Sequence, residues 1–110
     1  MARRIYNKLV RDGIPEIIRG DNGDPKTRIM DNEEYQIELF KKVIEEGKEL
    51  EAARGETKEV IKEIGDIYEV IDAIIESNGL DKDEIMTLKK VRREKRGGFK
   101  DKIFLEQVDE

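Results

Sequence analysis

Two pairs of acidic residues, each spaced three apart, are the part of this sequence best suited to chemistry. Glu46-x-x-Glu49 and Glu63-x-x-Asp66 lie in segments where we expect helices, and residues three apart share one helix face. If the two helices face each other, four carboxylates converge and repel one another unless a divalent cation neutralises them. Paired acidic motifs on facing helices are a known way to build such a metal site.

Glu46 occupies a position where a helix normally presents an apolar side chain to the core. At about 100° per residue, Leu39, Val43 and Leu50 fall within about 40° of one another, and Glu46 lies in the middle of that stripe. An unpaired buried carboxylate is costly, so it is normally protonated or paired with a cation. Glu63 falls at the margin of the apolar arc of the next helix.

The alternative is that these acidic pairs are solvated and carry no function. The chain has 27 acidic residues, and pairs three apart arise by chance in helices of this composition. Glu69-x-x-Asp72 is a second such pair, and Glu69 lies on the polar side of its helix. Spacing alone leaves both interpretations open, and the position of Glu46 on the stripe favours a metal site.

Capping residues and glycines predict the elements that position these acids. Asp31 caps a helix over 32–53 that Gly55 ends, and the next helix runs over 57–78 to Asn78-Gly79. A short helix over 14–19 precedes them, and a further helix runs from Asp81 to about 96. The tail after Gly97-Gly98 is either a short strand or an extended arm.

We expect one all-α domain over residues 1–110. Its centre is an antiparallel helix pair, joined by a short connection and accompanied by a third helix with extended terminal arms. The apolar arc of the helix over 57–78 is wider than one domain needs when 45% of the chain is charged. We therefore expect a homodimer or homotetramer in which oligomerisation completes a helical bundle.

The composition excludes several classes of site. The chain has no cysteine and no histidine, which excludes disulfides, thiolate or imidazole metal ligands and Ser-His triads. Any metal must be held by oxygen, as Mg²⁺, Mn²⁺ and Ca²⁺ are. No apolar run approaches the roughly 20 residues of a membrane span, and no apolar segment of a secretory signal follows the first residues. We expect a cytoplasmic protein without membrane contact.

The acidic pairs also carry a family resemblance. Glu45-Glu46-x-x-Glu49 followed by Glu63-x-x-Asp66 resembles the EExxE…ExxD signature of the MazG-like, all-α nucleoside triphosphate pyrophosphohydrolase superfamily. The opening segment Tyr6-Asn7-Lys8-Leu9-Val10-Arg11-Asp12 and the closing segments Arg96-Gly97-Gly98-Phe99 and Ile103-Phe104-Leu105 resemble its phosphoribosyl-ATP pyrophosphohydrolase-like branch. These blocks together span nearly the whole chain.

The resemblance implies a reaction and assigns residues to it. Mg²⁺, or Mn²⁺ in its place, would bind the phosphates of a nucleotide, and water would attack the α–β phosphoanhydride to give a monophosphate and pyrophosphate. Glu46, Glu49, Glu63 and Asp66 would be the metal ligands. Glu45 matches the leading position of the motif and would either hold a second metal or orient the water, so Glu45 and Glu46 are the catalytic candidates.

Basic residues are the candidates for binding substrate phosphates: Lys8, Arg11, Arg93, Lys95 and Arg96. Arginine forms paired hydrogen bonds with phosphate oxygens, and lysine acts as a point charge. The alternative for the last three is a solvated helix end, where the helix dipole favours cations. Nucleic-acid binding is disfavoured because the net charge is −5 and few aromatic residues lie beside the basic run.

The sequence therefore predicts a Mg²⁺-dependent nucleotide pyrophosphohydrolase. The alternative is a non-catalytic module, either a helical oligomerisation domain or a nucleotide sensor that keeps the acidic residues without turnover. The enzyme is favoured because all four expected ligand positions carry a carboxylate.

Overall fold

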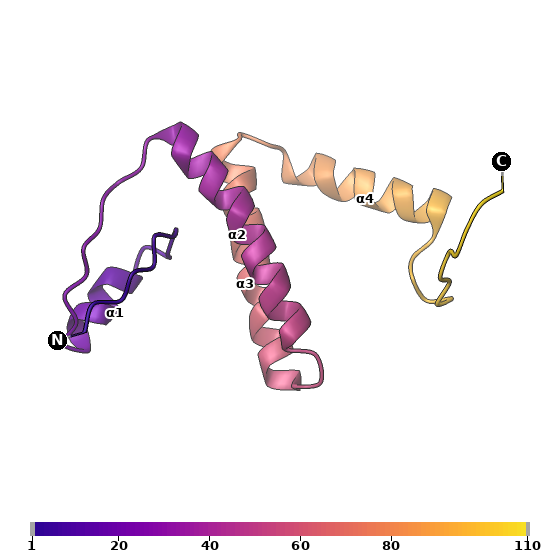
Figure 1. Cartoon of the computed structure of the whole chain (residues 1–110). Coiled ribbons are helices and arrows are strands. Elements are labelled where there is room, and N and C mark those ends of the chain that lie inside the picture. The colour runs from indigo at the N-terminus through magenta and orange to yellow at the C-terminus, as the bar shows by residue number, and fades with distance from the viewer. Residues whose placement is uncertain (1, 110) are drawn as a thin grey trace. The chain divides into compact units, whose positions relative to one another are not determined.

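The computed structural model describes residues 2–109, which contain four α-helices and no strand (Figure 1). The helices are α1 (Ile14–Gly20), α2 (Asn32–Ala52), α3 (Thr57–Ser77) and α4 (Lys82–Arg96). The all-α class predicted from the sequence is confirmed, and each helix begins and ends within about one residue of the expected position. None of the described helices is both long and apolar enough to cross a bilayer.

The chain divides into two compact units, Met1–Gly79 and Leu80–Glu110. The second contains α4, whose N-cap Asp81 accepts a hydrogen bond from the N–H of Asp83 at 2.9 Å. After α4, a turn closed by the N–H of Lys102 on the carbonyl of Phe99 leads into a tail without regular structure. Residues 99–109 therefore form no strand, and the extended arm stays a prediction. The single domain over 1–110 stays a prediction.

α2 and α3 form the antiparallel hairpin that the sequence predicts (Figure 1). The Asp31 carboxylate caps α2 by accepting the N–H of Glu34 at 2.9 Å. The chain reverses at Gly55, whose φ of 96° is a left-handed conformation that favours glycine. At the open end of the hairpin, Nδ2 of Asn78 donates to Oε1 of Gln36 at 3.0 Å, which links the end of α3 to the start of α2.

The interface between α2 and α3 buries few apolar side chains. Leu39, Ala53 and Val70 are the buried apolar residues of the described chain, with Leu39 only 2% exposed. Glu46 and Glu63 are buried among them at 6% and 5% exposure. The position of Glu46 on the core-facing stripe of α2 is therefore confirmed. So small an apolar interior gives the hairpin limited stabilisation.

Truncation of Leu39 should reveal how much the hairpin depends on this interior. We expect Leu39→Ala to lower the free energy of unfolding by about 2–4 kcal/mol, because it removes a buried side chain and leaves a cavity. Ile29→Ala is the matched control, since Ile29 is 97% exposed and should change stability by less than about 0.5 kcal/mol. Urea denaturation followed by circular dichroism measures both, and equal effects would contradict this account of the core.

Candidate metal centre

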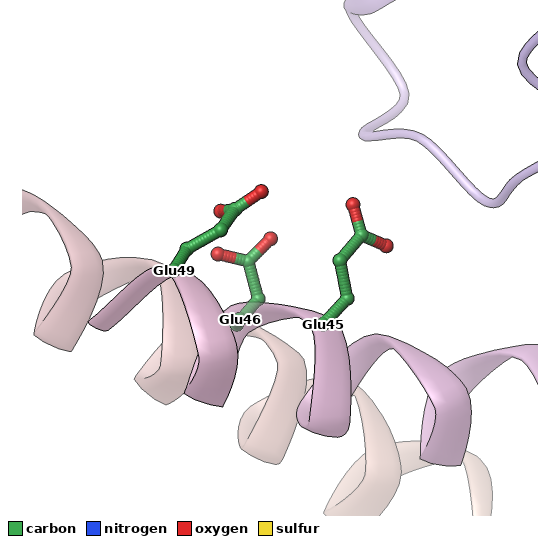
Figure 2. Close-up of side chains that lie close together, drawn as sticks. All are labelled: Glu45, Glu46 and Glu49. Carbon is green, nitrogen blue, oxygen red and sulfur yellow. The ribbon is translucent and has the colours of Figure 1, made fainter. Parts of the chain in front are cut away.

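Carboxylates from α2 and α3 converge at the hairpin. Oxygens of Glu46, Glu63 and Asp66 lie within 4.8 Å of one another, and so do oxygens of Glu45, Glu46 and Glu49. Figure 2 shows the second group projecting together from α2. Glu46 belongs to both groups, so the structure brings together all five acidic residues that the sequence singled out.

Two of these carboxylates leave a buried oxygen without a partner. Oε2 of Glu46 and Oε2 of Glu63 accept no hydrogen bond within the described chain. The solvated interpretation is wrong for both residues, because each is more than nine-tenths buried. Burial of an unpartnered carboxylate oxygen is costly. A cation held between α2 and α3 would satisfy both oxygens at once.

The protonation of Glu46 differs from that of Glu63. Burial, followed by the nearby carboxyl groups of Glu63 and Glu49, raises the pKa of Glu46 from 4.5 to about 7. The hydrogen bond donated by Nζ of Lys62 at 3.0 Å lowers the pKa of Glu63. Near neutral pH the buried pair therefore holds part of a proton, mainly on Glu46. A bound cation would compete with that proton.

Lys8 and Arg11 of the N-terminal segment contact the acidic residues. Nζ of Lys8 lies 3.2 Å from Oε1 of Glu45, and Nη2 of Arg11 lies 2.7 Å from Oδ1 of Asp66. Lys8 therefore contacts α2, and Arg11 contacts α3. Both were predicted to bind substrate phosphates, and the structure places both beside the carboxylates.

Two further lysines contact the site, and sequence reasoning missed both. Nζ of Lys42 lies 3.4 Å from Oε2 of Glu45 and 3.8 Å from Oε1 of Glu46, with 15% of the Lys42 side chain exposed. Lys62 contacts Glu63 from the neighbouring position on α3. The three- and four-residue spacing from Lys42 to the two glutamates was the available signal. That signal is weak in a chain with 22 basic residues.

Arg93, Lys95 and Arg96 lie in the last turn of α4, in the second unit. All three are exposed there, and cations in this position are favoured by the helix dipole. The structure therefore accounts for them as a helix end, and their contact with a phosphate stays a prediction.

Replacement of Glu46 should change how stability depends on pH when no metal is present. The folded chain binds a proton on Glu46 up to pH of about 7, whereas the unfolded chain loses it near 4.5. The contribution of Glu46 to stability is therefore fully present below about pH 4.5 and lost as the pH rises through about 7. We expect Glu46→Gln to be more stable than the wild type by about 1–3 kcal/mol at pH 8, and by less at pH 5.

Chemical denaturation in EDTA at the two pH values measures this difference. Glu69→Gln is the matched control, because Glu69 is exposed on α3 and its removal should leave the pH dependence of the wild type unchanged. A stability difference between Glu46→Gln and the wild type that is the same at both pH values would contradict the assignment of the buried proton to Glu46.

Compared with protein-family models, curated proteins and solved structures, the chain gives no match. The features that bear on function are therefore the buried carboxylates, the cations around them and the sequence motif that contains them.

Proposed function

We propose that this chain is a Mg²⁺-dependent nucleotide pyrophosphohydrolase. It would cleave the α–β phosphoanhydride of a standard or non-standard nucleoside triphosphate into a monophosphate and pyrophosphate. The observation that carries the proposal is the pair of buried, unpartnered oxygens on Glu46 and Glu63, on two packed helices. A cation site between helices is built in this way. The EExxE…ExxD resemblance supports nucleotide chemistry at such a site.

The available ligands fit a hard divalent cation. Glu46, Glu49, Glu63 and Asp66 offer carboxylate oxygens, which both Mg²⁺ and Mn²⁺ accept. In this proposal the four residues hold the metal, with Glu46 shared between the two groups of oxygens. When bound, the ion would neutralise charge on the phosphate oxygens and acidify a water molecule.

Glu45 is proposed to orient the attacking water and accept its proton. Burial opposes ionisation of Glu45, but the hydrogen bond from Lys8 and the charges of Lys42 and Lys8 outweigh it and lower its pKa. Its carboxylate is therefore available as an acceptor at neutral pH. A carboxylate within reach of water can act as a general base in this way, which suits a chain without histidine. Glu46, which is more deeply buried, is assigned to the metal.

Lys8 and Arg11 are proposed to exchange their carboxylate partners for substrate phosphates. Both side chains are partly exposed, at 39% and 56%, so each retains a side open to a ligand. The guanidinium of Arg11 suits two phosphate oxygens at once. Arg93, Lys95 and Arg96 remain candidates for phosphate binding.

The proposed enzyme is a homodimer or homotetramer, because one side of the hairpin is apolar and exposed. Ile37 and Ile44 of α2 and Ile61 and Tyr68 of α3 are each more than half exposed. At about 100° per residue, Ile44 and Glu49 are about 140° apart on α2, so the apolar stripe faces away from the carboxylates. Soluble monomers rarely leave such a contiguous surface uncovered. Two hairpins packed through it would make a four-helix bundle.

Pyrophosphate release tests the proposed activity. With Mg²⁺ we expect the wild type to release pyrophosphate from at least one member of a nucleoside triphosphate panel, and EDTA to abolish the release. Glu63→Gln removes a proposed ligand and should lower the rate about 100-fold or more. Glu69→Gln, on the exposed flank of the same helix, should retain nearly the full rate.

A folded wild type that releases no pyrophosphate from any substrate would contradict the enzymatic proposal. Nucleotide binding without turnover would then support a sensor, and the absence of both turnover and binding would support an oligomerisation module.

Light scattering tests the proposed assembly. The wild type should have at least twice the 12.8 kDa mass of the chain at micromolar concentration. Ile44→Asp places a charge in the apolar stripe and should shift the protein toward the monomer. Ile29→Asp, at a residue 97% exposed outside the two helices, should leave the mass of the assembly unchanged. A wild type that is monomeric at this concentration would contradict the proposal.

A further inference from the structure

The two groups of carboxylate oxygens that share Glu46 have different surroundings. In the first group, Glu46 and Glu63 each keep a buried oxygen without a partner, while Lys62 contacts the other oxygen of Glu63 at 3.0 Å and Arg11 contacts Asp66 at 2.7 Å. In the second group, Glu45 and Glu46 both contact the ammonium group of Lys42. The two carboxylates that keep a buried, unpartnered oxygen therefore lie together in the first group, between α2 and α3.

Lys42 is placed to act as the counter-ion of the second group. Its Nζ lies between Glu45 at 3.4 Å and Glu46 at 3.8 Å, and the side chain is mostly buried. The neighbouring Lys41 differs in both respects, because it is 68% exposed and pairs with Glu38 at 3.5 Å. Lys8 adds a second ammonium group on Glu45 at 3.2 Å, from outside the helices.

One divalent ion is enough to neutralise the site. Counting Glu59, which pairs with Lys62 at 3.9 Å, six carboxylates meet four cationic side chains: Lys8, Arg11, Lys42 and Lys62. When every carboxylate is ionised, two negative charges remain, which one divalent ion cancels. A second divalent ion would enter a cluster that is already neutral and would lie close to Lys42 and Lys8, where like charges repel.

We propose that Lys42, assisted by Lys8, fills the place of a second metal ion, so that the chain without nucleotide binds a single divalent ion at Glu46, Glu63 and Asp66. This inference rests on the proposed metal centre and deepens it. Glu45 is then paired with ammonium groups rather than with a metal, so its carboxylate can orient the attacking water and accept its proton. For the chain without nucleotide, this inference reduces the four proposed ligands to three: Glu49 belongs to the second group and becomes a ligand for a second ion only when Lys42 is absent or displaced.

Titration of the full chain with Mn²⁺ alone, by calorimetry at low ionic strength, tests the stoichiometry. The wild type should bind one ion. Lys42→Met keeps the aliphatic part of the side chain but removes the charge, and it should bind two. Lys41→Met is the matched control on the adjacent residue and should bind one. Circular dichroism establishes that each variant keeps its helices.

A second variant keeps the proposal falsifiable if Lys42→Met does not fold. Lys8 lies outside the helices, and Lys8→Met should raise the affinity for a second Mn²⁺ by about tenfold or more, because it removes one charge close to Glu45. Two ions bound to the wild type, one ion still bound to a folded Lys42→Met, or an unchanged second affinity in Lys8→Met would each overturn the inference and leave the proposed metal centre standing. A wild type that binds no ion would instead overturn the metal centre itself.

Discussion

The repulsion between Glu46 and Glu63 is the interaction on which the rest of the site depends. Both carboxylates are withdrawn from water between two packed helices, where apolar side chains would stabilise the hairpin instead. Nearby cations do not remove this cost, because an oxygen of each carboxylate stays unpartnered in the described chain. These buried carboxylates lower the stability of the hairpin, and a local loss of stability of this kind is expected at functional sites.

The negative charge of the acidic cluster also attracts the N-terminal segment to the hairpin. Residues 2–13 form no helix, yet Lys8 contacts Glu45 of α2 and Arg11 contacts Asp66 of α3. These contacts lie 37 and 55 residues apart in the sequence. Because both are partly exposed ion pairs, each is worth little by itself. These two contacts of the segment with the hairpin therefore depend on the negative charge of the acidic cluster.

The sequence predicts the helices well because their limits are set locally. Asp31 and Gly55 determine where α2 begins and where the chain reverses, through one capping hydrogen bond and one left-handed residue. The position of Glu46 in the interior follows from the helical periodicity of the apolar residues in α2, which is also a local property of the sequence. Lys42 and Lys62 could not be singled out, because helix spacing pairs many lysines with glutamates in this chain and burial decides which pairs matter. The partners of Lys8 and Arg11 depend on folding of the whole first unit, which no local pattern encodes.

The two sides of the hairpin impose opposite requirements on the same pair of helices. On one side, like charges push α2 and α3 apart unless a cation or proton joins them. On the other, Ile44 and Tyr68 are exposed apolar surface that water disfavours and a covering partner would bury. Whatever binds the folded hairpin and not the unfolded chain stabilises it by mass action. A cation between the carboxylates and a second copy on the apolar stripe would therefore each favour the other, because both select the state in which α2 and α3 are packed.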